Sequence, residues 1–269
     1  MLIIGERINA TRSRIARAMQ GRDAALIMRE AKKQAAAGAH VIDVNAGSDP
    51  AREIENLVWA VQVVQDAVEL PLCIDSAGPD GFKAALKVVK GADVMLNSVN
   101  GERERMDKVF PIAAEANAKL VGLLMDERGL PRGVDDRLEI AGKIVKGAEK
   151  AGIGVERLYI DPCVQPISTN PDQAVAVIES VRKVMKQFPG IHTTGGLSNI
   201  GFGLPYRAVL NRTFITLLIE AGLDSAIIDP TEPDMVATIL GTEALCGKDE
   251  WCMNYITAER EGRLRPKED

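Results

Sequence analysis

The chain has 269 residues, 46% hydrophobic and 26% charged, and its 33 Lys and Arg against 38 Asp and Glu give a net charge of −5. This acidic balance, without a basic tract, argues against a nucleic-acid or anionic-membrane partner. No apolar run is long enough to span a membrane, and the apolar amino-terminal segment is too short for a secretory signal. With four scattered cysteines and no CxxC pair, the composition favours a cytoplasmic protein with reduced thiols.

Short apolar runs alternate with longer segments of helical periodicity along the whole chain. Most runs are apolar at consecutive positions, which is typical of parallel strands covered on both faces. We predict strands over residues 2–6, 40–44, 72–75, 93–98, 120–125, 158–161, 191–196 and 225–229. Eight strands, each followed by a helix, favour a closed (β/α)8 TIM barrel over the alternative, an open doubly wound sheet.

The helices between these strands carry ordinary boundary residues. Asp23 is placed to cap a helix that continues to Ala37. Four helices are predicted to end at a glycine shortly before the next strand, namely Gly38, Gly91, Gly152 and Gly222. No linker divides the chain, so we expect a single domain over residues 1–262 and a charged, solvated tail over 263–269.

Barrel enzymes carry their chemistry at the carboxyl ends of the strands. Here every predicted strand runs into a carboxylate or a carboxamide, and none ends in lysine or histidine. The absence of lysine argues against Schiff-base chemistry. His40 opens a strand at the opposite end, and His192 is predicted to be a packed or hydrogen-bonded strand residue rather than a metal ligand. The strand-end residues are Glu6, Asn9, Asp43, Asn45, Asp75, Asn97, Asp126, Asp161, Asn199 and Asp229.

These residue types are compatible with more than one chemistry. A paired-carboxylate glycosidase stays open, although only two tryptophans are present to form sugar platforms. A magnesium site from Asp43, Asp75 and Asp126 also stays open, but barrels that stabilise enolates need a lysine or histidine base as well. The pattern most favours hydrogen bonding to a flat heterocycle. A carboxylate accepts two parallel bonds, and an asparagine donates and accepts side by side, which matches the aminopyrimidinone edge of a pterin.

Seven motifs carry a family resemblance, and they follow one another in order across nearly the whole chain. They are LIIGERIN (2–9), CIDS (73–76), LNSVNGERER (96–105), LYIDP (158–162), GGLSN (195–199), LNRTF (210–214) and GLDSAIIDP (222–230). Together they resemble the methyltetrahydrofolate:corrinoid-protein methyltransferases. That family has a pterin-binding TIM barrel related to dihydropteroate synthase and to the folate module of cobalamin-dependent methionine synthase.

The resemblance implies a function. A methyl group would move between N5 of methyltetrahydrofolate and the cobalt of a corrinoid, in a homodimeric enzyme that requires no bound metal of its own. The corrinoid modules of such systems contain D-x-H-x-x-G, whereas the nearest segment here, GIHTTG (190–195), lacks the aspartate. The corrinoid is therefore expected on a separate protein that docks over the barrel mouth. The direction of transfer is left open, because the same residues serve both directions.

The resemblance also assigns roles to individual residues. Asn199 is the implied catalytic residue, since its amide would reach the nitrogen that carries the methyl group. The implied pterin-binding residues are Asp75, Asn97, Asp161, Gly196, Ser198 and Asn199. The benzoate and glutamate tail of the folate would meet Arg207 and Phe202. The remaining candidates for the pocket wall are Glu6, Asn9, Asp43 and Asn45.

Two alternative functions stay open beside this one. A non-catalytic subunit that only binds the pterin or folate would not require Asn199 to face the reacting nitrogen. Dihydropteroate synthase is the other alternative, but synthases carry a lysine in a G-x-S-x-K type strand end, where this chain has GGLSN. Both features favour a methyltransferase.

Overall fold

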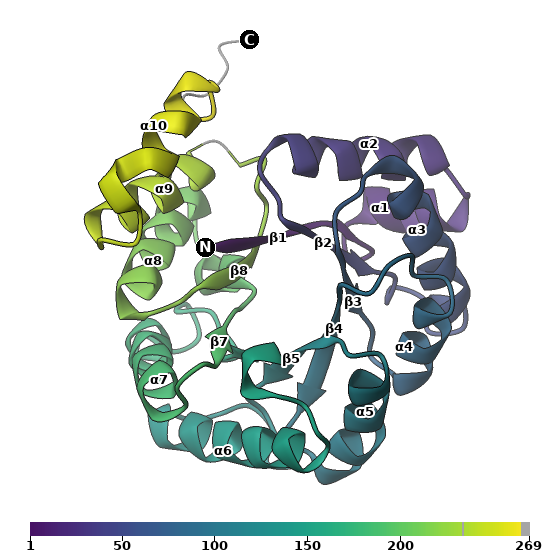
Figure 1. Ribbon diagram of the computed structural model, residues 1–269, viewed down its shortest axis with the longest axis horizontal. Helices are drawn as coiled ribbons and strands as arrows, with labels where there is room; N and C mark the ends of the chain where they lie inside the picture. Colours follow the sequence, from purple (N-terminus) through teal and green to yellow (C-terminus); the bar gives the residue numbers. More distant parts are fainter. Residues whose placement is uncertain (233, 265–269) are drawn as a thin grey trace.

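The computed structural model describes residues 1–232 and 234–264, in which eight parallel strands form a barrel inside a ring of helices (Figure 1). The strands are hydrogen-bonded in the order β7-β6-β5-β4-β3-β2-β1-β8. They are β1 (Leu2–Asn9), β2 (Val41–Asn45), β3 (Leu72–Asp75), β4 (Val94–Asn100), β5 (Lys119–Leu123), β6 (Leu158–Asp161), β7 (His192–Thr193) and β8 (Ser225–Ile228). The predicted (β/α)8 barrel is confirmed, and the open-sheet alternative is wrong.

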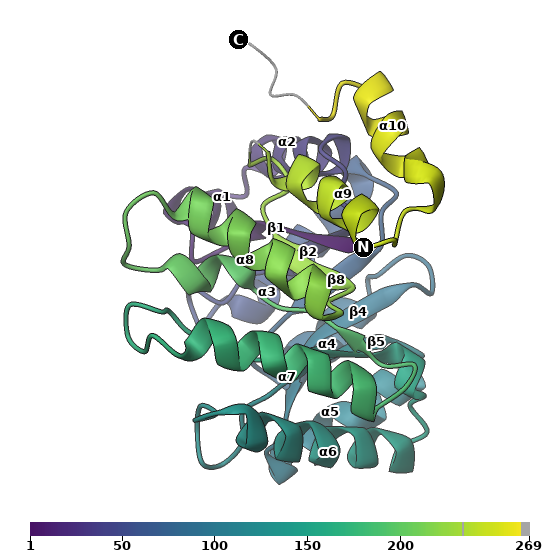
Figure 2. The same cartoon turned by 90° about the vertical axis from the view of Figure 1, so that its left-hand side faces the viewer.

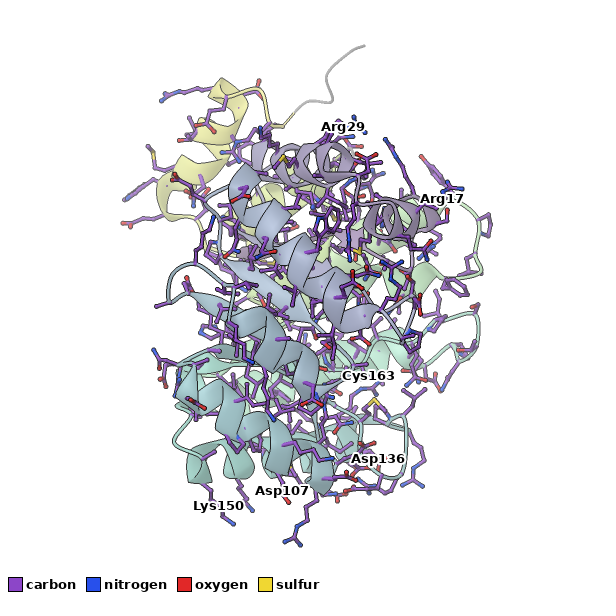
Figure 3. All side chains as sticks on the ribbon, turned by 90° about the vertical axis from the view of Figure 1, so that its right-hand side faces the viewer. Arg17, Arg29, Asp107, Asp136, Lys150 and Cys163 are labelled. Carbon is purple, nitrogen blue, oxygen red and sulfur yellow. The ribbon has the colours of Figure 1, made fainter. Side chains whose placement is uncertain are left out.

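Helices cover the outside of the barrel (Figure 2). Their bounds are α1 (Ser13–Gln20), α2 (Ala24–Ala36), α3 (Glu53–Ala67), α4 (Pro79–Leu86), α5 (Arg103–Glu115), α6 (Val134–Lys150), α7 (Gln173–Gln187), α8 (Arg207–Ala221), α9 (Met235–Leu245) and α10 (Met253–Arg260), with short 3₁₀ helices η1 (Val155–Arg157), η2 (Leu197–Gly201) and η3 (Glu250–Cys252). The predicted cap is present, since the Asp23 carboxylate accepts the Leu26 backbone N–H at 3.0 Å. Charged side chains extend outward from the helices, as Arg29, Asp107 and Lys150 do in Figure 3.

The strand predicted over 191–196 is wrong in extent, because β7 contains only two residues. Side-chain bonds replace much of the ladder between β7 and β8. The Asp224 carboxylate accepts the Thr193 backbone N–H at 2.9 Å, and the Ser225 hydroxyl donates to the Thr193 carbonyl at 3.0 Å. Further along, Ile227 N–H donates to the Gly195 carbonyl at 2.9 Å. These contacts close the barrel and release the chain after Thr193 to form the loop that carries η2.

Two apolar layers explain why the strands are apolar at consecutive positions. Inside the barrel, a small cluster fills the space below the carboxyl ends, consisting of Ile4, Val41, Cys73, Met95, Val121, Tyr159 and Ile227. The alternate side chains, such as Ile42, Ile74 and Leu96, are fully buried between the strands and the helices. Burial of each aliphatic side chain stabilises the fold by about 1.5–3 kcal/mol. The filled interior leaves the carboxyl end as the place where a cavity can open.

Three further findings bear on the sequence predictions. No helix among the described residues is long and apolar enough to cross a membrane. All four cysteines are free thiols. Of the predicted tail, Arg263 donates to the Glu261 carboxylate at 2.8 Å, whereas residues 265–269 lie outside the described part of the chain.

The prediction of a helix ending at Gly91 is wrong, because α4 ends at Leu86. All four glycines predicted to end a helix have positive φ, and Gly222, the C-cap of α8, has the largest value, 118°. A Cβ built there would lie 3.2 Å from Met185 Cγ.

We expect Gly222→Ala to lower the free energy of unfolding by about 1–2 kcal/mol, because an alanine in the left-handed region is strained. Gly142→Ala is the matched control. It lies inside α6 with open space around it, and should raise stability by about 0.5–1 kcal/mol. Denaturant titration measures both, and equal effects would contradict the prediction.

Candidate functional site

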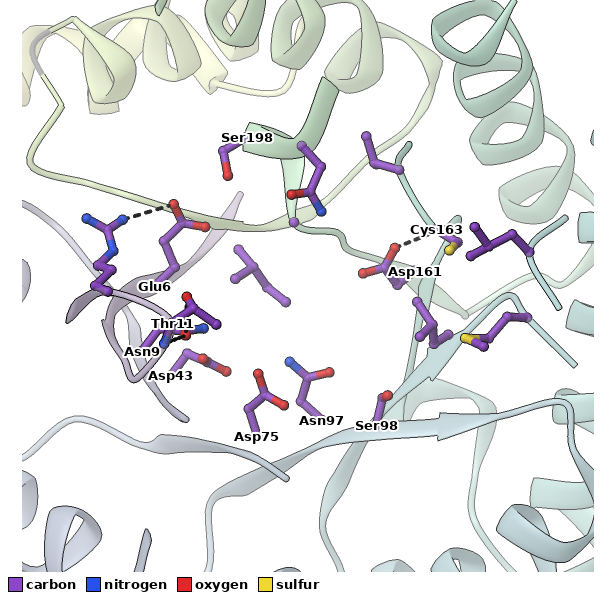
Figure 4. A pocket seen from close by; sticks show the side chains of 18 residues that line it. Glu6, Asn9, Thr11, Asp43, Asp75, Asn97, Ser98, Asp161, Cys163 and Ser198 are labelled. Atoms are coloured by element: carbon purple, nitrogen blue, oxygen red, sulfur yellow. Dashed lines mark hydrogen bonds and ion pairs between the residues drawn. The ribbon is translucent and has the colours of Figure 1, made fainter. Parts of the chain in front are cut away.

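A cavity of about 580 Å³ opens at the carboxyl ends of the strands (Figure 4). This size suits a small-molecule site. Polar side chains from successive strands form most of its wall, and a few apolar ones complete it. The lining residues are Glu6, Asn9, Thr11, Arg12, Asp43, Asp75, Asn97, Ser98, Leu123, Met125, Leu130, Asp161, Cys163, Val164, Gly196, Ser198, Asn199 and Ile227.

Most of the predicted site residues meet in this cavity. Asp75, Asn97 and Asp161 come from β3, β4 and β6, and Figure 4 shows Asp75 and Asn97 side by side with Asp161 across the opening. η2, in the loop after β7, supplies Ser198 and Asn199. The convergence follows from parallel strands, whose carboxyl ends all reach one end of a barrel.

Three predicted residues lie outside the lining set. Asn45 supports the wall from behind, since its side chain hydrogen-bonds Asp75 and its Oδ1 accepts the Gly47 N–H at 3.0 Å. Arg207, at the start of α8, donates to the Ser198 carbonyl, and its guanidinium carbon lies 5.7 Å from the centre of the Phe202 ring. Phe202 is itself 62% exposed. The pair therefore brackets η2 beside the cavity.

Two of the strand-end carboxylates, Asp126 and Asp229, do not line this cavity. Asp126 is held by Arg128 and Lys143, with its Oδ2 at 2.9 Å from both Arg128 Nη2 and Lys143 Nζ. These partners hold the pKa of Asp126 well below its usual range. Asp229 accepts from Arg7 Nη1 at 2.7 Å. Ion pairing has turned both carboxylates into structural groups, which removes Asp126 from the magnesium alternative.

The structure also bears on the predictions about a metal site and about His192. Among the described residues, no three His, Cys, Asp or Glu side chains are arranged to hold a metal ion. His192 is a strand residue as predicted: its ring stacks on Tyr159 at a centroid distance of 4.6 Å, and its Nδ1 lies 2.6 Å from Asp224 Oδ2. Cys163 lines the cavity, but burial raises its pKa to about 12, so it is a neutral thiol rather than a nucleophile.

Burial controls the protonation of the cavity carboxyls. It raises the pKa of Asp161 to about 6, against the opposing effect of backbone N–H donors from Cys163 and Gly196. It also raises the pKa of Asp75 to about 6, while the bond from Asn45 acts in the other direction. Asp43 is 1% exposed, and burial together with the neighbouring Asp75 charge places its pKa well above the ordinary value. These carboxyls accept hydrogen bonds, and donors from a ligand would stabilise their ionised form.

An arginine that does not lie at a strand end fixes β3 and β4. Arg105, on α5, donates from Nη2 to the Ser98 carbonyl at 2.6 Å and to the Ser76 carbonyl at 3.1 Å. Its Nε donates to the Ser98 carbonyl at 3.1 Å as well. The guanidinium therefore holds together the backbone beside Asp75 and Asn97. The sequence carried one indication of this role, since Arg105 ends the motif LNSVNGERER.

A second arginine fixes the end of β6. Arg137 is fully buried on α6, and it donates from Nε to the Pro162 carbonyl at 2.6 Å and from Nη2 to Gln173 Oε1 at 3.0 Å. It thereby anchors the segment directly after Asp161. Its position in an apolar stripe with Ile140 and Ile144 was the available indication, because an arginine on a core-facing stripe needs buried acceptors.

The fold and the cavity define a class: a (β/α)8 barrel with a polar small-molecule site at the carboxyl ends of its strands. A family model described as pterin binding enzyme matches residues 5–229. The chain belongs to this pterin-binding enzyme family, which confirms the resemblance seen in the motifs.

Similarity to individual proteins extends over the whole chain. Methylcorrinoid:tetrahydrofolate methyltransferase from Eubacterium limosum is 41% identical over 271 residues, which cover 99% of this chain and 98% of that protein. Methionine synthase from Mycobacterium leprae is 33% identical over 244 residues, which cover 85% of this chain and 20% of that much longer protein. Among solved structures, dihydropteroate synthase from Xanthomonas albilineans in complex with 7,8-dihydropteroate has a TM-score of 0.73 at 18% identity, with 92% of this chain and 93% of that chain covered.

We expect Arg137→Met to lower the free energy of unfolding by about 3 kcal/mol, because the buried acceptors on Pro162 and Gln173 would lose their donor. Arg132→Met is the matched control, since Arg132 is 82% exposed and pairs with Asp136 at the surface. It should change stability by less than about 0.5 kcal/mol. Urea titration measures both variants, and similar losses in the two would contradict an anchoring role for Arg137.

The cavity carboxyls should make the ligand-free protein less stable as pH rises. Their folded pKa values, about 6 for Asp75 and Asp161, exceed those of unfolded carboxyls, so the folded state binds more protons between about pH 4 and pH 8. Stability is therefore lost as pH rises through this window. At pH 8, Asp75→Asn should increase the free energy of unfolding by on the order of 2 kcal/mol, whereas Asp80→Asn, at an exposed position, should have little effect. A lower stability of Asp75→Asn at pH 8 would contradict the prediction.

Proposed function

We propose that this chain transfers a methyl group between the cobalt of a corrinoid and N5 of tetrahydrofolate, in the direction from methylcorrinoid to tetrahydrofolate. The observation that carries the proposal is the combination of a carboxylate and carboxamide cavity with 41% identity, over 99% of this chain, to a methylcorrinoid:tetrahydrofolate methyltransferase. Both observations are needed. The polar cavity supports binding of a pterin, and the similarity to a methyltransferase supports methyl transfer as the reaction.

The pterin would be held by Asp75, Asn97 and Asp161. A carboxylate accepts two parallel bonds from a donor–donor edge, and a neighbouring carboxamide both donates and accepts. Burial of Asp75 and Asp161 raises their pKa to about 6, so both are mainly ionised at neutral pH and act as acceptors. In the proposal, Gly196 and Ser198 complete the pterin site, while Glu6, Asn9 and Asp43 close the wall.

Asn199 would act at the reacting nitrogen. Its amide is neutral, so it can hydrogen-bond N5 in either protonation state without competing for the proton. The remaining work is to hold the two reactants in line and to stabilise charge that develops on the nitrogen. η2 keeps the residue in place through the Phe202 N–H, which donates to the Asn199 carbonyl at 3.0 Å. Arg207 and Phe202, beside the same element, would meet the benzoate and glutamate tail.

Partners follow from the same proposal. The methyl donor would be a methylcorrinoid carried on a separate protein that covers the barrel mouth. Apolar side chains at this end support docking, since Phe202, Tyr206 and Leu130 are 62%, 77% and 55% exposed. We also propose a homodimer, supported by two exposed apolar side chains, Leu245 at the end of α9 and Trp251 in η3. We further propose that the barrel needs no metal ion of its own.

The test is single-turnover methyl transfer from methylcobalamin to tetrahydrofolate under anaerobic conditions, followed by the cobalamin absorbance. Wild-type protein should catalyse transfer, and Asn199→Ala should lower the rate by about 100-fold with less than about 1 kcal/mol change in unfolding free energy. The control is Asn254→Ala, at an exposed position on α10.

Three outcomes would contradict parts of the proposal. Tight tetrahydrofolate binding without any methyl transfer would favour a non-catalytic folate-binding subunit. Absence of folate binding would overturn the pterin proposal altogether. If Asn199→Ala lowered the unfolding free energy by as much as it raised the activation free energy, Asn199 would be a structural residue of η2.

A further inference from the structure

A second cavity lies behind the wall of the first. It has a volume of about 20 Å³, and its polar lining consists of Glu6, Ser198, Asn211, Asp229 and Glu232. These five residues belong to β1, η2, α8 and the segment after β8. Glu6 and Ser198 also line the large cavity, so they form the partition between the two. The volume is enough for one water molecule.

Two acceptors at the small cavity lack partners. Asn211 Oδ1 and Glu232 Oε1 are buried, and neither has a hydrogen-bond partner among the residues that the structure describes. Buried polar atoms in folded proteins are nearly always paired with protein or with ordered water. A water molecule carries two donors, which is the number that these two oxygens require. Both the volume of the cavity and its two unpaired acceptors therefore indicate a bound water molecule.

Glu6 faces charged groups from several elements. Arg12 Nη2 lies 3.4 Å from its carboxylate, and Arg207 adds a second, weaker positive charge. The negative charges of Asp229 and Glu232 act in the opposite sense. Burial is the largest effect and raises the pKa of Glu6 to about 7. From deeper in the barrel, Asp43 also interacts with Glu6.

We propose that the small cavity holds a water molecule which, with Glu6 and Glu232, carries a proton between the methyl-transfer site and solvent. This rests on the proposed function. When the N5 lone pair forms the new bond to the methyl carbon, the cobalt–carbon bond breaks and its electron pair stays on cobalt. The proton that N5 carried must then leave, and Asn199 is too weak a base to accept it. Glu6 accepts the proton, the water passes one to Glu232, and Glu232 releases it to solvent.

The alternatives to Glu6 are less well placed. Asp161 accepts backbone N–H bonds, one of them from Cys163 at 2.8 Å, and Asp75 is bonded to Asn45. Both line the large cavity alone. Glu232 suits the outer end of the path because it is only partly buried while one of its oxygens faces the interior. Glu6 and Glu232 each gain one proton and lose one proton per turnover, so the relay needs no additional acid or base.

The first experiment is high-resolution diffraction from crystals of the whole chain without substrates. We expect a water molecule within hydrogen-bond distance of both Asn211 Oδ1 and Glu232 Oε1. An empty cavity would overturn the proposal. This readout does not depend on methyl transfer, so it separates the water site from the proposed function.

The second experiment follows proton release with a pH-indicator dye during a single turnover of methylcobalamin and tetrahydrofolate. Glu232→Gln and Glu6→Gln should each slow proton release at least about tenfold, with unchanged tetrahydrofolate affinity in Glu232→Gln and partial rescue by added imidazole. Glu104→Gln, which removes an exposed carboxylate on α5, should release the proton at the wild-type rate.

Wild-type rates and pH profiles in both glutamine variants would overturn the relay even if the water is present. A general loss of folding would be seen as a lower unfolding free energy, and the conservative variant Glu232→Asp, which keeps a titratable group, should then recover proton release. Failure of the proposed function is a distinct result: wild-type protein would transfer no methyl group, and the relay would fall with it.

Discussion

The cost of burying carboxyl groups inside the mouth of the barrel is the constraint on which the site depends. Asp43, Asp75 and Asp161 have no ion-pair partner in the described part of the chain, and burial raises the pKa of each. Neutral donors reach Asp75 and Asp161, and Asp43 Oδ1 has no partner among the described residues. A neutral heterocycle with a donor edge would supply further hydrogen bonds to these carboxyls without adding a charge.

Arginines keep this wall in place without neutralising it. Arg105 donates to the Ser98 carbonyl and Arg137 donates to the Pro162 carbonyl, and both carbonyls lie beside the cavity carboxyls in sequence. Their charge still reaches Asp75 and Asp161 at a distance and moderates the rise in pKa. The geometry of the site and its electrostatics are thus set by one group of residues, whose guanidinium planes fit several carbonyl oxygens at once.

Sequence pattern predicted most of the residues that line the cavity, but it did not distinguish which strand-end carboxylates lie there. Asp75 and Asp126 both follow apolar strands, and both were expected at the same barrel end. Asp126 instead pairs with Arg128 and Lys143, because the chain after β5 turns back and brings cations over it. Asp75 has no such neighbour. The same limitation applies to β7, where Asp224 on the adjacent segment takes over part of the ladder and shortens the strand.

The sequence by itself determined the barrel, the end of it that carries the polar residues, and the pterin-binding family. Consecutive apolar runs can only be buried on both faces, and motif order is a property of the chain alone. Tertiary structure decided which strand-end carboxylates face the cavity, which arginines hold them, and that Glu6 separates two cavities. These are contacts between residues far apart in sequence, such as Arg7 with Asp229. Periodicity cannot report them, because it records which face a side chain occupies and not what lies opposite.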